Sequence, residues 1–264
     1  MDLGIEGRRA VVSAASSGLG RASALALAAE GAEVTLIARD LGRLEAAAGD
    51  IEAATGRRPR TASVDLADGA AVDAFVSSAN ASGEPVSILV TNSGGPPAKV
   101  FLECEPEDWE SAFRLLFMST VRLIRGFLPG MIDGGWGRIV CVTSTAAKEP
   151  VENLMLSNSI RAAVTGMAKT LSREVGNKGV LINTLAPGFH DTPALDRLVT
   201  KLIDQGKAES REQVYGGWLS GVPVDRMGDP AAFGRAVAFF ASNACDYLTG
   251  VNVPIDGGRT RATF

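Results

Sequence analysis

Residues that often mark a reactive site are scarce in this sequence: its 264 residues include one histidine, two tyrosines and three cysteines. Cys104, Cys141 and Cys245 are odd in number and widely spaced, and no Cys-x-x-Cys pair occurs. This pattern argues against a disulfide framework and against a zinc site, so no bound metal is expected.

Positive charge is in short supply as well. The 26 Lys and Arg are outnumbered by 30 Asp and Glu, which gives a net charge of −4 and an isoelectric point near 5.2. Nucleic acids and anionic membranes need clustered basic residues, so neither is expected as a partner, whereas a small neutral or anionic ligand remains open. The N-terminus lacks the features of a secretory signal, and no run of 18 apolar residues occurs. These absences predict a cytoplasmic protein that does not span a membrane.

Apolar residues make up 46% of the chain and fall into short continuous runs, separated by segments with helical spacing. Continuous runs are typical of strands buried on both faces of a parallel sheet. The alternation predicts an α/β fold, a Rossmann-type doubly wound and mostly seven-stranded parallel sheet with helices on both faces. We expect one domain over residues 1–264. The runs are RRAVVS, AEVTLIA, RTASVD, VSILVTN, GRIVCVTS, VLINTLA and GVNVPID.

One long segment, residues 189–228, separates the sixth and seventh runs. Long segments at the carboxyl ends of such strands are usually lids or binding loops. We therefore expect a substrate lid there.

The turn after the first run contains two glycines that suit phosphate binding. Gly18 and Gly20 would let the backbone approach a phosphate, and the helix that follows would offer free N–H groups and its positive dipole end. An ordinary β-α turn would carry the same glycines, but doubly wound folds hold a dinucleotide pyrophosphate at this first turn.

Four motifs resemble, in order, those of the short-chain dehydrogenase/reductase family, and together they cover essentially the whole chain. SAASSGLG (13–20) is similar to the family's TGxxxGxG loop, and TNSG (91–94) to its NNAG motif. NTLAPGFHDT (183–192) is similar to the segment beside the nicotinamide, and GVNVPIDGG (250–258) to the closing strand. The resemblance implies a dinucleotide held by Ala14, Ser16, Ser17, Gly18, Leu19, Gly20, Arg39, Asp65, Leu66, Asn92, Ser93, Gly94, Arg161, Pro187, Gly188 and Thr192.

Ala14 departs from the family pattern, because it stands where the family's first glycine is expected. Its methyl group is harmless if φ is negative, but it is strained if φ is positive and obstructive if the cofactor passes very close. We expect nucleotide binding to survive this change.

The end of the second run bears on the cofactor. NAD users of the family carry an acid at the position of Ala38, whereas Arg39 follows where NADP users often carry a base. A guanidinium suits a 2′-phosphate, so NADP(H) is favoured over NAD(H), although a solvated surface Arg and the neighbouring Asp40 weigh against it. Asp65 matches an adenine-contacting Asp of the family, or it caps a helix beginning near Ala67.

The family's catalytic Ser, Tyr, Lys and Asn are implied at Ser144, Ser157, Arg161 and Leu116, so three of the four are replaced. SNSIR keeps the i, i+4 spacing that places two side chains on one helical face. A serine hydroxyl is a poor proton donor where a phenol is expected. Arg161 can still hold the nicotinamide ribose and place positive charge near a developing oxyanion.

Two residues are candidates for the missing acid. Lys148 follows Ser144 by four residues, and burial beside Arg161 would make its ammonium a better proton donor, whereas a loop lysine is more often only solvated. His190, the single histidine, is expected to face the same cleft, although a plain polar contact is its commoner role.

Two functions follow. The first is an NADP(H)-dependent oxidoreductase that transfers hydride between nicotinamide and a carbonyl or secondary alcohol, like a 3-oxoacyl or ketone reductase, with Ser144, Ser157, Arg161 and Lys148 as its catalytic candidates. The second is a nucleotide-binding protein without turnover, with a sensor or scaffold role. The resemblance also implies homodimers or homotetramers formed through the two long helices around residues 109–128 and 156–175.

Overall fold

Seven parallel strands form one sheet in the order β3-β2-β1-β4-β5-β6-β7, which confirms the doubly wound prediction. The computed structural model describes residues 2–81 and 83–263. Each strand falls in one of the runs read from the sequence, and only β6 extends beyond its run, by one residue to Pro187. Their bounds are β1 Arg9–Ser13, β2 Glu33–Ala38, β3 Arg60–Ser63, β4 Ile88–Thr91, β5 Gly137–Val142, β6 Val180–Pro187 and β7 Asn252–Ile255.

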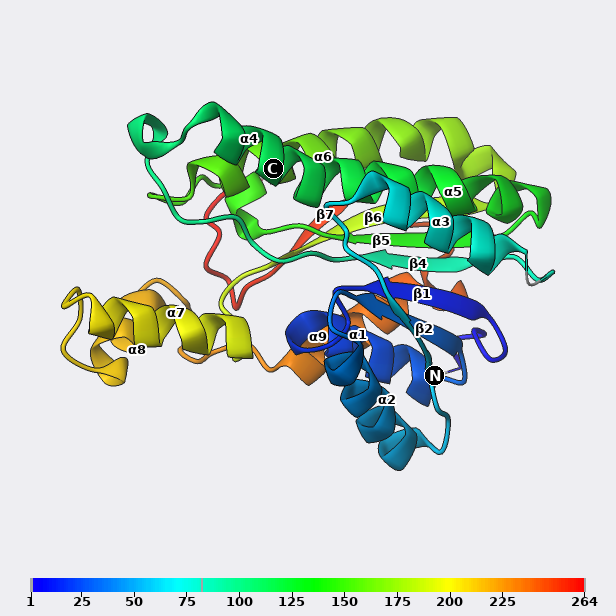
Figure 1. Cartoon of the computed structure of the whole chain (residues 1–264), viewed down its shortest axis with the longest axis horizontal. Coiled ribbons are helices and arrows are strands. Elements are labelled where there is room, and N and C mark those ends of the chain that lie inside the picture. The colour runs from blue at the N-terminus through cyan, green and yellow to red at the C-terminus, as the bar shows by residue number, and fades with distance from the viewer. Residues whose placement is uncertain (1, 82, 264) are drawn as a thin grey trace.

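Helices cover both faces of the sheet and bury the central strands (Figure 1). On one face lie α1 (Gly18–Ala29), α2 (Leu41–Thr55) and α9 (Pro230–Phe240), with a core around Leu27, Leu36 and Phe233. On the other lie α3 (Gly69–Asn80), α5 (Ser119–Asp133) and α6 (Met155–Val175), with a core around Leu89, Phe127 and Ile139. Strands β1, β4 and β5 are buried along their whole length, as continuous apolar runs require.

Residues Pro106–Asp133 form one long helical rod, in which α4 (Pro106–Ala112) passes through a π-helical stretch, Phe113–Met118, into α5. By length and composition this rod could cross a membrane, although it contains no run of 18 consecutive apolar residues. Only 39% of its most apolar window is buried within the chain. Its α5 part packs on α3, β4 and β5, so the rod belongs to the helix layer of the fold.

The predicted lid is helical. Helices α7 (Pro193–Asp204) and α8 (Arg211–Leu219) pack on each other and form a lobe beside the sheet and its two helix layers (Figure 1). The ion pair between Arg211 and Asp196 joins them. Short 3₁₀ turns complete the chain at Phe101–Glu103, Thr145–Ala147, Gly176–Lys178 and Asn243–Cys245.

The strand order reverses between β1 and β4, where doubly wound sheets open a crevice at the carboxyl ends. Ser13 and Asn92 tie these two ends together. The Ser13 hydroxyl donates to the Asn92 carbonyl at 2.7 Å and accepts from the Asn92 N–H at 2.8 Å.

Candidate functional site

The turn from β1 into α1 is tightly packed around Gly20. A Cβ added at Gly20 would lie 2.4 Å from the Ala14 carbonyl oxygen and 2.9 Å from the Asn92 side-chain nitrogen, so any larger residue would push the turn apart. Ala14 has φ of +48°, in the left-handed region that glycine tolerates best. Because its φ is positive, Ala14 is strained at this position.

Free donors stand at the start of α1. Ser17 occupies the N-cap position, yet its side chain makes no capping hydrogen bond. The first N–H groups of α1 lack partners within the helix, and the dipole adds partial positive charge there. The arrangement suits a phosphate group.

A cavity of about 310 Å³ lies beside this turn and gathers residues from the ends of β1, β2, β3 and β4. Seven predicted cofactor residues line it: Ala14, Ser16, Ser17, Arg39, Asp65, Leu66 and Gly94. Because the cavity runs from the phosphate-binding turn to the end of β2, its residues fit the adenosine half of a dinucleotide.

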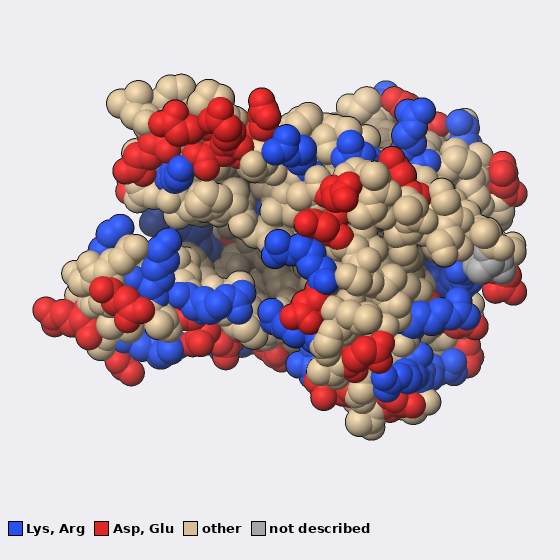
Figure 2. All heavy atoms as spheres, viewed as in Figure 1, with Lys and Arg blue, Asp and Glu red and all other residues tan. Residues whose placement is uncertain are grey.

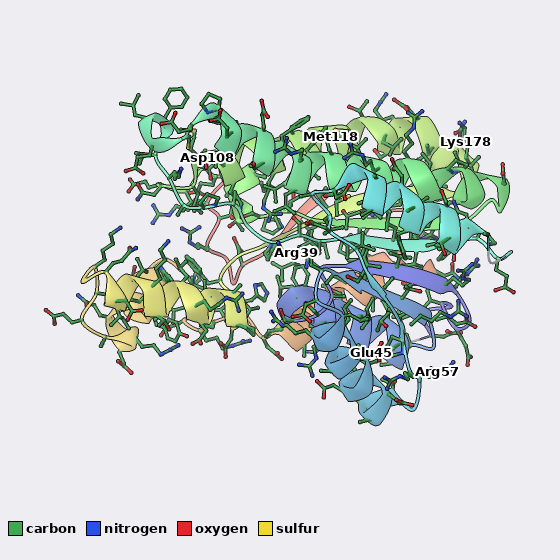
Figure 3. The ribbon with its side chains drawn as sticks, viewed as in Figure 1. Arg39, Glu45, Arg57, Asp108, Met118 and Lys178 are labelled. Atoms are coloured by element: carbon green, nitrogen blue, oxygen red, sulfur yellow. The ribbon has the colours of Figure 1, made fainter. Side chains whose placement is uncertain are left out.

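Arg39, which is labelled in Figure 3, is exposed at the end of β2, and Ala38 before it leaves no acid at that position. Arg43 also lines the cavity, a cation that sequence reasoning missed. The sequence did contain a signal for Arg43, because it follows Arg39 by four residues, about one helical turn. Asp40, between them, caps α2 by accepting the Arg43 N–H at 3.0 Å. Two guanidinium groups thus stand where a 2′-phosphate would lie, while Asp40 serves as a helix cap.

Asp65 also lines this cavity, and its alternative role as a helix cap is wrong. Helix α3 begins at Gly69 and is capped by Asp68, which accepts from the N–H groups of Ala70 and Ala71. Asp65 instead accepts from the Ala67 N–H at 3.0 Å and holds the turn after β3.

Thr192 lies against the nucleotide turn, because a Cβ at Gly18 would be 3.5 Å from its side chain. It also caps α7 by accepting the Leu195 N–H. Gly188 has a packing role, since a Cβ there would lie 2.6 Å from the Cβ of Asp256. Of the remaining predicted cofactor residues, Leu19, Ser93 and Pro187 flank these contacts along the chain without lining the cavity.

Arg161 reaches from α6 to the end of β5, where its guanidinium donates to the Val142 carbonyl at 3.2 Å. Burial lowers the pKa of Arg161 to about 10, which leaves it protonated at neutral pH. No carboxylate pairs with it among the described residues. A buried guanidinium without a carboxylate partner favours an anionic or strongly polar ligand beside it.

Ser144 follows β5 at the same strand end, and its hydroxyl accepts from the Ala146 N–H at 3.2 Å. Ser157 is buried on α6, and within the described chain its hydroxyl forms no hydrogen bond. Lys148 ends the turn after Ser144 and is half-buried. Leu116 is buried inside the π-helical stretch, an irregularity that often marks functional positions.

The expectation that His190 faces the cleft of these residues is wrong. Its ring packs edge-on against Phe233 of α9, at 5.4 Å between centroids, and only 5% of the residue is exposed. It contributes to a different, smaller cavity with Asp229 and Asp256. Burial lowers the pKa of His190, so the ring is neutral at pH 7 and unsuited to donate a proton.

Aromatic side chains join the lid to the strand end. Phe189 stacks on Trp218 of α8 at 5.1 Å with 9° between the rings, and Tyr215 lies 6.0 Å from Trp218. These three aromatic side chains therefore lie together where the α7–α8 lobe meets the end of β6.

A phosphate-binding turn, an adenosine-sized cavity at the strand reversal and a polar cluster at the end of β5 define a dinucleotide-binding protein of the doubly wound class. The profile of the short chain dehydrogenase family matches residues 8–202. The chain therefore belongs to the short-chain dehydrogenase family.

Two relatives match nearly the whole chain. It is 30% identical over 255 residues to a 2-keto-3-deoxy-L-fuconate dehydrogenase of Xanthomonas campestris pv. campestris, covering 96% of this chain and 80% of that protein. It is 30% identical over 256 residues to the 3-oxoacyl-(acyl-carrier-protein) reductase FabG of Vibrio harveyi, covering 97% and 98%. The crystal structure of L-sorbose reductase from Gluconobacter frateurii, complexed with NADPH and L-sorbose, superposes with a TM-score of 0.91 at 32% identity, covering 99% and 100%.

Proposed function

We propose that this protein is an NADP(H)-dependent oxidoreductase that interconverts a carbonyl compound and a secondary alcohol through a non-standard active site. The cavity beside the β1–α1 turn carries this proposal, because it ends at Arg39 and Arg43 with no acid at residue 38. A relative of solved structure binds NADPH, which supports the same cofactor here.

Electrostatics favours the phosphorylated cofactor. A 2′-phosphate dianion would be repelled by an acid at the end of β2, and this chain offers two guanidinium groups there. Asp40 opposes them in charge, but its carboxylate is turned to the Arg43 N–H as a cap. Two guanidinium groups beside a strand end that has no acid at residue 38 therefore suit NADP(H) better than NAD(H).

Hydride comes from the nicotinamide when the cofactor is bound, and the chain's own residues handle the charge on the substrate. Ser144 follows β5, and Arg161 donates to the carbonyl of its last residue, Val142, so a hydroxyl and a cation at this strand end can stabilise the alkoxide that forms as hydride arrives. In reduction one proton must then reach that oxygen, and Lys148 or a water held near Ser157 supplies it. Losing a dedicated phenol costs about 10²- to 10⁴-fold in rate, which slows turnover without abolishing it.

A nucleotide-binding protein without turnover is the second candidate. It is favoured by Ser157 and Arg161, which stand thirteen and seventeen residues after Ser144 where the family resemblance implies Tyr and Lys. Against it stand the polar character of these positions and the geometry that keeps Arg161 at the strand end.

A fluorescence titration with NADPH and NADH tests the nucleotide site. We expect NADPH to bind at least tenfold more tightly, and Arg39→Ala to remove most of that preference while leaving NADH binding unchanged. Arg57→Ala, an exposed arginine paired with Glu6 on another part of the surface, serves as the matched control. If neither nucleotide binds at millimolar concentration, the oxidoreductase function is refuted. Binding without turnover on a carbonyl panel would favour the second candidate.

The assembly is proposed from the resemblance and from unburied apolar surface. The rod Pro106–Asp133 has a mean hydropathy of 1.4 over its most apolar window yet is 39% buried there, and Phe113 on it is exposed. A second copy packed along the rod and α6 would cover this surface in a homodimer or homotetramer. All three cysteines are free, which suits the reducing cytoplasm. Sedimentation at a monomer mass would refute the assembly.

A further inference from the structure

The segment after β7 crosses from the lid side of the molecule to the α6 side (Figure 1). Its first turn is fixed by Asp256, whose carboxylate accepts the N–H of Gly258 at 3.0 Å and of Thr260 at 2.7 Å. We call residues 256–263 the tail. Because Gly188 packs on Asp256, the tail starts beside the strand end that lies next to the nucleotide turn.

Two contacts hold the tail across the substrate side. The Arg259 guanidinium lies over the ring of Phe189, 5.0 Å from its centroid, and Phe189 in turn stacks on Trp218 of the lid. Two residues later the Arg261 N–H donates to the Glu149 carboxylate at 2.8 Å. Glu149 follows Lys148 in the loop after Ser144. The tail thus spans the two loops that flank the proposed catalytic residues.

Arg259 has no acidic partner. It belongs to none of the ion pairs of the described residues. The two nearby carboxylates accept other donors. Asp256 accepts the N–H groups of Gly258 and Thr260, and Glu149 accepts the N–H of Arg261. A half-buried guanidinium held against an aromatic ring keeps its donors for a ligand.

The surroundings add positive charge. Lys148 and Arg161 also lack carboxylate partners in the described residues. Figure 2 shows Lys and Arg side chains around the hollow between the α7–α8 lobe and the body, while Asp and Glu gather over α4. A substrate anion placed in this hollow would meet cations on more than one side.

We propose that the tail forms an anion subsite in which Arg259 binds a carboxylate of the substrate, so that the preferred substrate is an oxo acid or hydroxy acid. The guanidinium donates, and a carboxylate offers the acceptors that it lacks. This inference rests on the proposed oxidoreductase function, since it names the class of carbonyl compound. It makes Arg259 a specificity residue.

A charge-matched pair of compounds tests the subsite: 2-oxo-4-phenylbutanoate and its ethyl ester. We would measure kcat/KM for both with NADPH, and in parallel the calorimetric Kd of both for the protein with saturating NADP⁺. The acid should be preferred in the wild type. Arg259→Gln should reduce the acid-to-ester ratio by about ten- to hundredfold, the worth of a charge-assisted hydrogen bond, and Arg259→Lys should restore part of it.

Arg235→Gln, which removes an exposed arginine of α9, is the matched control and should leave the ratio unchanged. Equal affinity for acid and ester in the wild type, or a ratio that Arg259→Gln does not alter, would overturn the subsite. If neither compound supports NADPH oxidation, the proposed function is refuted instead. The calorimetric Kd values for the acid and the ester then still decide whether the subsite exists.

Discussion

Replacing Ala14 by glycine tests whether the nucleotide turn stores strain. Ala14 holds φ at +48°, and the left-handed region costs an L-residue about 1–2 kcal/mol that glycine escapes. Glycine has more freedom in the unfolded chain, which costs about 0.5–1 kcal/mol. The net expectation is that Ala14→Gly stabilises the fold by about 0.7 kcal/mol.

Ala15→Gly is the control, since Ala15 is fully buried in the same turn and is not among the described residues with positive φ. It loses a buried methyl group worth about 0.8 kcal/mol in addition to the entropy term, so it should destabilise by about 1.5 kcal/mol. The two variants should differ by about 2 kcal/mol. For a chain of this length that corresponds to roughly 4–8 °C in Tm.

Urea unfolding and calorimetric melting of both variants measure this difference. The Ala14 methyl also lines the nucleotide cavity, so Ala14→Gly should lower the Kd for NADPH several-fold. If Ala14→Gly destabilises as much as Ala15→Gly, the turn carries no strain at this residue and the reasoning fails.

Three further variants probe the site. Gly20→Ala places a methyl 2.4 Å from the Ala14 carbonyl oxygen, so NADPH affinity should drop at least tenfold in a fluorescence titration, and wild-type affinity would contradict that packing. Because burial lowers the pKa of His190, the folded state binds fewer protons than the unfolded chain, and stability is lost as pH falls below 6.5. His190→Gln should therefore flatten the urea-derived stability between pH 7 and pH 5; an unchanged slope would exclude His190 as its source. Burial lowers the pKa of Arg161 to about 10, and the same burial should bring the pKa of a lysine toward neutrality, so Arg161→Lys should make NADPH affinity fall as pH rises from 6 to 9, unlike the wild type.

Most of the sheet could be predicted because its signals are local. Each strand is a short continuous apolar run between helical segments, and such an order leaves few topologies once crossovers are right-handed. The two helices of residues 189–228 were not predicted, although their caps are local signals. Thr192 precedes Pro193, and Ser210 precedes α8, as N-cap residues.

The site was predictable only where a motif fixes the backbone. The turn residues and Arg39 gather around one cavity, as their motif order implies. Asn92 packs on this turn from the end of β4, and His190 is buried against Phe233 of α9. Such contacts join distant residues, so no sequence period reveals them.

The stacking of Trp218 on Phe189 gives the lid its own optical label. The chain has three tryptophans, and Trp136 is held between the guanidinium groups of Arg8 and Arg138 at 3.9 and 4.4 Å, far along the chain from the lid. Replacing Trp109 and Trp136 by phenylalanine would leave Trp218 as the single emitter. Its intensity and lifetime would then follow the lid in real time through ligand binding, without any attached dye.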